Sequence, residues 1–323
     1  IIYDVGGRRM TRITPDDRLG RAALRAARPG VFPLGARGAG RFAMQGVYHL
    51  RPLTAQNAGD WSHSGQGGAF RQVGPTKIAV FTVVNSLGAI VDREGNVVRC
   101  SRNDPGLPCP KITEWLSRPA STPDGTESAP TSNTTLTLVV TNQKLPFAHL
   151  QRLAKQVHGA MSRAIQPFAT QADGDVLYAV STDQVENEEL QPIELATIAS
   201  ELAWDAVLAS VPDARDVVPP PVVPTGEGLD PAALEAYVGD FEFSDFSRVA
   251  IRVEDGQLVA RYGGISHIYF WEEVHALLPA GPDQFVIDLP ARDVIRFERD
   301  GDGVHALVLN PGPWALRAAR SDE

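Results

Sequence analysis

The chain changes character abruptly at residue 134, and this junction constrains its folding more than any other feature of the sequence. Residues 103–133 are dominated by Pro, Ser, Thr and Gly and contain little that a core could bury. The segment that follows, TTLTLVVTN (134–142), has the β-branched composition and the alternation of a strand. We therefore expect an exposed linker or flexible loop that runs directly into a buried strand beginning at Thr134.

The periodic segments on both sides of this junction predict a mixed α/β unit. The run KIAVFTVVN (77–85) is almost continuously apolar, which suits a strand covered on both faces. A first helix is expected with Thr14 as its N-cap and Pro15 at its first helical position. The other expected elements are strand and turn over 1–14, a hairpin over 88–100, helices over 146–165 and 192–208, and a strand over 173–182.

A proline-rich spacer separates this unit from a C-terminal part of different composition. The spacer, DVVPPPVVPTGEG (216–228), contains three consecutive prolines, which make a stiff and extended segment. The part that follows holds a short helix, PAALEAYVG, and then only strand-like pieces with turns at 255–256 and 300–303. The expected organisation is therefore a first domain over 1–215, a linker over 216–228 and a small antiparallel β domain over 229–323.

Composition excludes several classes of partner. With 39 acidic against 30 basic residues the net charge is -9, which disfavours nucleic acid or an anionic membrane as a partner. No apolar run reaches the ~20 residues that a membrane-spanning helix requires. Cys100 and Cys109 bracket a short loop that a disulfide could close, but two free thiols in a reducing compartment are favoured. We expect a cytoplasmic protein, with any N-terminal signal unobservable because the chain opens at Ile1.

The Asn133-Thr134 bond is also where the chain can generate its own chemistry. If that bond breaks, Thr134 gains an α-amine whose unperturbed pKa is roughly 7.7–8.0, so the amine can accept the proton of its own hydroxyl. This route needs no histidine, and the sequence offers no convincing Ser-His-Asp arrangement and no GxSxG motif. Read locally, the junction is otherwise only a loop that meets a strand.

Four segments resemble a known enzyme family. They are SNTTLTLVVTN (132–142), AKQVHGAMSRAIQPF (154–168), DGDVLYAVSTD (173–183) and IASELAWDAVL (198–208). These look like the nylon-oligomer hydrolases (endo-type 6-aminohexanoate-oligomer hydrolases) of the peptidase family S58, which also holds L-aminopeptidase/D-esterases and β-peptidyl aminopeptidases. The resemblance runs from Ile1 to about Leu208. It implies an α/β fold, an αββα sandwich of the N-terminal-nucleophile (Ntn) hydrolase type, made as one precursor that cuts itself.

The resemblance places the self-cleavage at the junction. Thr134 matches the nucleophile and Asn133 matches the residue before the cleaved bond. Asp173 and Asp175, in the segment DGD, match an acidic pair that would hold the Thr134 ammonium and hydroxyl. Their separation of two at the start of a strand places both carboxylates on one face. Without the resemblance, DGD would be read as a plain turn.

Two further residues receive roles from the resemblance. Asn85, which closes the strand predicted over 77–85, matches an amide that stabilises the oxyanion, and its local alternative is a strand-end cap. Tyr3 matches a tyrosine that shapes the substrate pocket, and its alternative is a core aromatic. No metal and no cofactor is implied.

The sequence departs from the family in two places. A lysine is expected after GARGAGRFAMQG (35–46), where this chain has Val47, and Arg51 is an alternative source of the cation. The family also has a long segment before the strand that carries Tyr3. We therefore expect the chain to be a fragment of a longer gene, with an N-terminally incomplete sandwich.

The sequence thus predicts an autoprocessing N-terminal-threonine amide hydrolase that cleaves linear aliphatic amides such as 6-aminohexanoate (nylon) oligomers, or short peptides, and that forms a homo-oligomer. A close alternative is an aminopeptidase for D- or β-amino acyl substrates. An alternative of another class is a degenerate, non-catalytic assembly protein, which Val47 and the missing front suggest. The C-terminal β domain resembles small modules appended to serine hydrolases and β-lactamase-like proteins, and its role is open.

Overall fold

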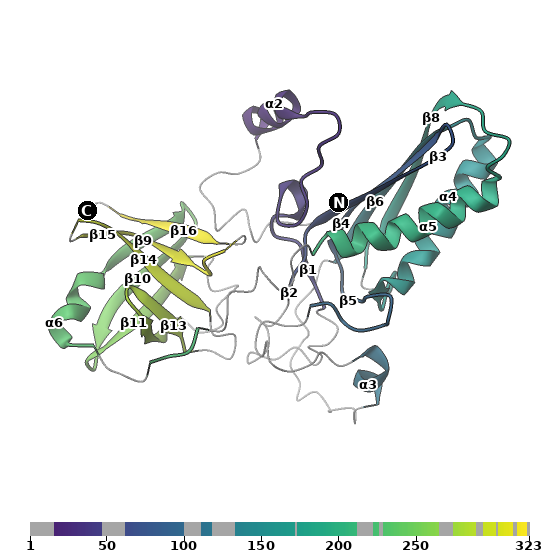
Figure 1. The fold of residues 1–323 in the computed structure, drawn as a ribbon. Coiled ribbons are helices and arrows are strands. Elements are labelled where there is room, and N and C mark those ends of the chain that lie inside the picture. The colour runs from purple at the N-terminus through teal and green to yellow at the C-terminus, as the bar shows by residue number, and fades with distance from the viewer. Residues whose placement is uncertain are drawn as a thin grey trace. The chain divides into compact units, whose positions relative to one another are not determined.

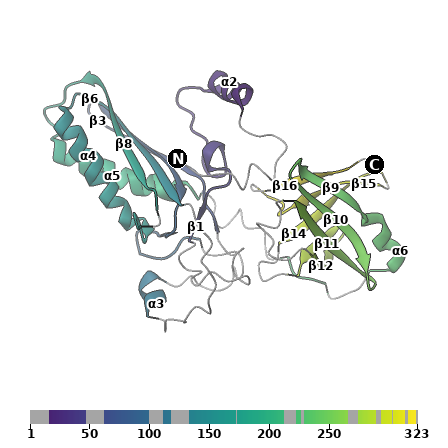
Figure 2. The same cartoon turned by 180° about the vertical axis from the view of Figure 1, so that it is seen from behind.

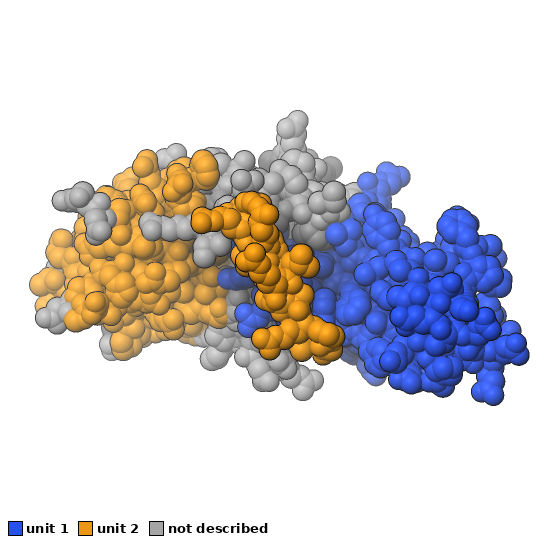
Figure 3. Space-filling view, turned by 90° about the horizontal axis from the view of Figure 1, so that it is seen from above, with its two compact units in different colours: residues 1–3, 32–54, 60–214 blue, residues 4–31, 55–59, 215–323 orange. Residues whose placement is uncertain are grey.

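In a computed structural model, the chain forms two compact units (Figures 1, 2 and 3). Unit 1 comprises residues 1–3, 32–54 and 60–214, and unit 2 comprises residues 4–31, 55–59 and 215–323. The residues that the structure describes are 16–46, 62–99, 111–117, 133–171, 173–211, 222–225, 229–264, 274–288, 293–301, 303–312 and 315–321.

Unit 1 is built on a four-stranded sheet in the order β3-β4-β6-β8. The β4 strand pairs antiparallel with both β3 and β6, whereas β8 pairs parallel with β6. The β6 strand begins at Thr134, so the abrupt start predicted from the sequence is confirmed. The strands are β3 (Gln66–Val73), β4 (Thr76–Asn85), β6 (Thr134–Gln143) and β8 (Val176–Val185).

Two helices, α4 (Phe147–Ala160) and α5 (Pro192–Ala209), cover one face of this sheet (Figures 1 and 2). The α5 helix starts where the sequence predicts, because Gln191 and Glu194 form a reciprocal capping box and Pro192 occupies the first helical position. Alternate residues of β4 and β6, such as Val80 and Val139, are fully buried in one cluster with apolar residues of both helices. This cluster is the core of unit 1.

The opposite face of the sheet carries the other half of the alternating residues and is much less buried. Phe70 and Tyr178 are each 62% exposed, and Leu138 is 36% exposed. The expectation that the strand at 77–85 is covered on both faces is therefore wrong for the described residues. The β4 strand buries Ile78, Val80 and Val84, whereas Phe81 on the other face is only half-buried. The sequence suggests a strand covered on both faces because the residues on the exposed face of β4 are also apolar.

Short elements flank the end of the sheet where β6 begins. The hairpin predicted over 88–100 is only partly present, because β5 (Ala89–Ile90) pairs with β7 (Ile165–Gln166) rather than with the return segment. A single bridge joins Val91 to Val97 around the predicted turn. The remaining pieces are η1 (Gly38–Gly40), β1 (Met44–Gln45), β2 (Ser62–His63), α3 (Ile112–Leu116) and η3 (Met161–Arg163).

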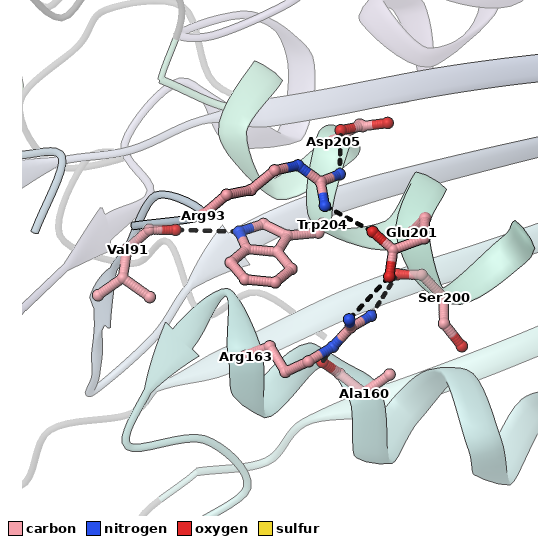
Figure 4. A network of polar contacts seen from close by, with 8 residues as sticks. All are labelled: Val91, Arg93, Ala160, Arg163, Ser200, Glu201, Trp204 and Asp205. Atoms are coloured by element: carbon pink, nitrogen blue, oxygen red, sulfur yellow. Dashed lines mark hydrogen bonds and ion pairs between the residues drawn. The ribbon is translucent and has the colours of Figure 1, made fainter. Parts of the chain in front are cut away.

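A polar network ties this region to the helices (Figure 4). The indole N–H of Trp204, on α5, donates to the carbonyl oxygen of Val91 at 3.1 Å. The guanidinium groups of Arg93 and Arg163 lie 4.9 and 5.0 Å from the Trp204 ring centre, and both bind the carboxylate of Glu201, at 2.5 and 2.7 Å. The network therefore fixes the segment that follows β5 against the C-terminal half of α5 and against Arg163 of η3.

In unit 2, the described strands of the C-terminal part form a closed antiparallel barrel in the order β10-β11-β12-β13-β14-β15-β16-β9. The predicted antiparallel β domain is confirmed, and its closure depends on the pairing of β16 with β9. Phe241, Phe243 and Phe285 fill the interior, as expected when eight strands leave room only for side chains. The elements are α6 (Pro231–Leu234), η4 (Glu235–Tyr237), β9 (Gly239–Ser244), β10 (Ser247–Glu254), β11 (Gln257–Gly264), β12 (Val274–Gly281), β13 (Gln284–Ile287), β14 (Val294–Asp300), β15 (Gly303–Leu309) and β16 (Leu316–Arg320).

The first described helix corrects one prediction. The α2 helix spans Asp17–Ala26, and its N-cap is Asp16, whose carboxylate accepts from the Leu19 N–H at 2.7 Å. Thr14 is therefore not the cap, because the carboxylate two residues later binds one of the free N–H groups of the first turn, that of Leu19. None of the helices in the described part of the chain is long and apolar enough to cross a membrane. Predictions for Tyr3, Val47, Arg51, Cys100 and Cys109 fall outside the described residues.

Candidate active site

The candidate site forms where β6 begins, beside the end of β4 and the segment that leads into β8. Thr134 lies directly across the antiparallel ladder from Asn85, and Asn133 pairs with Asp173 in a parallel bridge. Residues directly opposite on neighbouring strands have Cβ atoms about 5 Å apart on the same face. The structure therefore brings Thr134, Asn85 and Asp173 together, although they are far apart in the sequence.

The side chain of Thr134 belongs to the sheet face opposite the helices. The hydroxyl of Thr137 lies 3.5 Å from the sulfur of Met161, which places the odd-numbered residues of β6 on the helical side. Because side chains alternate along a strand, Thr134 and Leu136 point the other way. Thr134 is nonetheless only 7% exposed, as is Asn133, and the segment leading into β8 pairs with the start of the strand at Asn133.

The bond before Thr134 is held in a defined geometry. The Thr134 hydroxyl donates to the carbonyl oxygen of Asn133 at 2.6 Å, so the hydroxyl lies against the carbonyl of the bond predicted to break. The backbone N–H of Gly174 donates to the same oxygen at 2.8 Å. A carbonyl with two donors is polarised, and polarisation favours addition of a nucleophile to its carbon.

The two aspartates of DGD flank this carbonyl and bind backbone groups on either side of it. One oxygen of Asp173 accepts from the Leu87 N–H at 3.1 Å, and the other accepts from the Thr170 hydroxyl at 2.7 Å. Asp175 accepts from the Thr135 N–H at 2.5 Å and from the Ala169 N–H at 3.1 Å. Burial raises the pKa of Asp175 above its ordinary value, the Thr135 N–H opposes that rise, and the nearby Asp173 charge adds to it.

These contacts refine what the sequence predicts for the acidic pair. The Asp175 carboxylate binds the N–H of the residue after Thr134, and in the uncut chain the described partners of both carboxylates are N–H and hydroxyl groups of neighbouring segments. Their predicted action on the Thr134 ammonium concerns a group that exists only after cleavage, and it stays a prediction. In the uncut chain they hold the two ends of the segment that presents Gly174.

Asn85 has an oriented side chain. Its Oδ1 accepts the backbone N–H of Met44, on β1, at 3.0 Å. This bond places the Oδ1 atom of Asn85 toward β1, so the amide nitrogen of Asn85 points away from the Met44 N–H. Asn85 and Thr134 are cross-strand partners, so their side chains lie on the same face of the sheet, the one away from the helices. Its oxyanion role stays a prediction.

Gly174 was not predicted from the sequence as a site residue, and the reason is physical. The group that contacts the Asn133 carbonyl is a backbone N–H, which has no side-chain signature. The available signal was the absence of a side chain, because a Cβ at Gly174 would lie 2.8 Å from the Thr134 hydroxyl oxygen. In the sequence alone, this glycine reads only as part of an acidic turn.

A groove of about 550 Å³ lies between the helices and contains none of the predicted site residues. It is lined by His149, Arg152, Leu153, Lys155, Gln156, Pro192, Ile193 and Ala196. These residues belong to α4 and α5, whereas the Thr134 side chain belongs to the opposite face of the sheet. The groove is therefore separate from the candidate site.

Comparison with known proteins finds that the model of peptidase family S58 matches residues 10–219. The chain is 39% identical over 223 residues to a putative NylC-analogous protein of Agromyces sp. (strain KY5R), covering 64% of this chain and 68% of that protein. It is also 39% identical over 223 residues to a 6-aminohexanoate-oligomer endohydrolase of Paenarthrobacter ureafaciens. The chain spans about 59% of the length of that endohydrolase.

Among solved structures, an L-aminopeptidase D-Ala-esterase/amidase from Ochrobactrum anthropi aligns with a TM-score of 0.37 and 20% identity. The alignment covers 59% of this chain and 48% of that structure.

Proposed function

The chain belongs to peptidase family S58, and from this premise we propose that it is an autoprocessing amide hydrolase that cuts itself between Asn133 and Thr134. The freed Thr134 then serves as nucleophile, and its α-amine serves as base. The resemblance read from the sequence is confirmed by the family match, which covers residues 10–219.

The self-cleavage is an N-to-O acyl shift followed by hydrolysis. The Thr134 oxygen adds to the Asn133 carbonyl carbon while its proton leaves, the C–N bond breaks, and the Thr134 nitrogen takes up a proton. This gives an ester between the Asn133 acyl group and the Thr134 oxygen. Water then cleaves the ester, leaving a carboxylate on Asn133 and both a free hydroxyl and a free amine on Thr134.

One observation carries the proposal: the Thr134 hydroxyl lies 2.6 Å from the carbonyl oxygen of its own peptide bond, in a site that leaves Thr134 only 7% exposed. The arrangement found here places the hydroxyl next to the carbon that it would attack.

The substrate class is proposed from the relatives. We propose linear aliphatic amides such as 6-aminohexanoate oligomers, because the chain resembles 6-aminohexanoate-oligomer endohydrolases at 38–39% identity. A second candidate is an aminopeptidase, which the 31% identity to an uncharacterized aminopeptidase of Mycobacterium leprae supports, and its action on D- or β-amino acyl groups is proposed from the sequence resemblance. Hydrolysis rates of the 6-aminohexanoate trimer and of β-alanyl amides, compared on the same preparation, separate the two.

Denaturing mass spectrometry of the purified chain tests the self-cleavage. We expect two pieces, residues 1–133 and 134–323. Thr134→Ala should leave the chain intact, and Thr134→Ser should restore cleavage because it keeps the hydroxyl. A wild-type chain that stays intact and behaves like Thr134→Ala would overturn the proposal and favour the non-catalytic alternative.

The oligomeric state and the cellular location of the protein are also proposed from the family and the sequence. We propose a homo-oligomer, which light scattering coupled to size exclusion would test. We also propose a cytoplasmic location, consistent with only two cysteines in the whole chain. Fractionation of cells that express the full gene would test this location.

A further inference from the structure

The carbonyl oxygen of Asn133 has two described donors in the uncut chain, and only one of them can persist through the reaction. The Thr134 hydroxyl donates at 2.6 Å and the Gly174 N–H donates at 2.8 Å. When the Thr134 oxygen adds to the carbonyl carbon, its hydrogen leaves and the first hydrogen bond ends. Negative charge then develops on the Asn133 oxygen while Gly174 remains in place as a donor.

The Gly174 N–H is held rigidly by bonds on both sides. The preceding residue, Asp173, pairs with Asn133 in the strand bridge and binds the Leu87 N–H. The following residue, Asp175, binds the Thr135 N–H at 2.5 Å, one residue beyond the nucleophile. A donor fixed in this way does not need to reorganise as charge appears, which is the condition under which an oxyanion donor is most effective.

Gly174 also leaves the space that the nucleophile needs. A Cβ at this position would lie 2.8 Å from the Thr134 hydroxyl oxygen, closer than real Cβ contacts, and 3.6 Å from the Asn133 oxygen. Its φ is not in the left-handed range, so backbone conformation alone does not demand glycine here. The missing side chain is therefore explained by the close approach of the hydroxyl.

We propose that the backbone N–H of Gly174 is the oxyanion donor of the self-cleavage. It stabilises the tetrahedral adduct formed when the Thr134 oxygen adds to the Asn133 carbon, and again the adduct formed when water adds to the ester. This role rests on the proposed function, because it presupposes that the 133/134 bond is cut. It is distinct from the role that the resemblance gives to Asn85, whose side chain is anchored to Met44 through Oδ1.

The sharpest test replaces the Asp173–Gly174 amide by an ester, with glycolic acid introduced at position 174 by nonsense suppression in the full chain. This change removes the N–H and adds no atom that could clash. Loss of one oxyanion donor slows catalysis by about 10²–10³-fold. We expect that slowing in the first-order cleavage rate, followed by intact mass. Cleavage within about threefold of wild type would overturn the proposal.

Two further variants keep the test decisive if the ester chain does not fold. Gly174→Ala and Gly174→Pro both add a Cβ beside the Thr134 hydroxyl, but only proline removes the N–H. The proposal predicts that Gly174→Pro cleaves at least tenfold more slowly than Gly174→Ala, and equal rates would overturn it. Thermal melts in a Thr134→Ala background compare the folded state of each variant without cleavage. A wild-type chain that never cleaves defeats the proposed function itself, which distinguishes that failure from the failure of this inference.

Discussion

Replacing Gly174 by alanine tests how closely the self-cleavage depends on the space beside the nucleophile. The new methyl group would lie 2.8 Å from the Thr134 hydroxyl oxygen, so the hydroxyl must move. In the wild type, attack starts from the position that the hydroxyl already occupies beside the Asn133 carbonyl, but in the variant the added methyl group blocks that position. Attack must then proceed with the hydroxyl about 30° off its rotamer, which costs about 0.5–1.5 kcal/mol. The barrier therefore rises by about 0.5–1.5 kcal/mol, or roughly 2–13-fold in rate.

The assay is the rate at which the intact mass is lost after the chain is allowed to fold. Gly159→Ala is the matched control, because Gly159 lies in α4 and a Cβ there would meet nothing within 4 Å. We expect the control to cleave at the wild-type rate. The reasoning would be refuted if Gly174→Ala also cleaved within twofold of wild type while both variants melted at the wild-type temperature in a Thr134→Ala background.

Three further predictions concern other parts of unit 1. Asn85→Ala should slow substrate hydrolysis by about 10²–10³-fold and slow self-cleavage much less. The reason is that the described donors to the Asn133 carbonyl are Thr134 and Gly174, not Asn85. Equal losses of rate in the two assays would contradict this prediction. Trp204→Phe should lower the unfolding free energy by about 1–3 kcal/mol in urea, because the Val91 carbonyl loses its indole donor; an unchanged midpoint would count against it. Burial raises the pKa of Asp175, so in the uncut chain its contribution to stability is present below its ordinary pKa and is lost as pH rises through the raised value. Asp175→Asn in a Thr134→Ala background should remove that part of the pH slope, as measured by urea unfolding from pH 3.5 to 7, and an unaltered slope would refute the assignment.

The elements predicted most accurately are those whose ends are set by local chemistry. The α5 helix begins at Pro192 because a proline and a capping box coincide there. The β6 strand begins at Thr134 because the composition changes at that residue. The cap of the first helix was misplaced because Thr14 and Asp16 are both good caps, and only the three-dimensional structure shows which one bonds a free amide.

Features that depend on distant contacts were harder to predict. The sequence indicates an antiparallel β domain but not a closed barrel. Closure requires β16 to pair with β9, which lies about 80 residues earlier in the chain, and no local sequence pattern encodes such a pairing. In the candidate site, Asn133 and Asp173 could be named from the resemblance. The backbone N–H groups that bind them, those of Gly174 and Leu87 respectively, could not, because any residue type except proline supplies that donor.

The backbone donors bear on whether the chain is an enzyme or a non-catalytic relative. A chain that only assembles needs neither a threonine hydroxyl against its own peptide carbonyl nor a glycine that leaves it room. Either residue could change alone without opening a cavity in the core, because neither belongs to the buried cluster between the sheet and the helices. Cleavage chemistry, by contrast, requires both at once: the hydroxyl to attack, and the N–H to hold the charge that the attack creates. Their joint presence at one carbonyl therefore favours the catalytic reading over the degenerate one, and the two positions should lose function together.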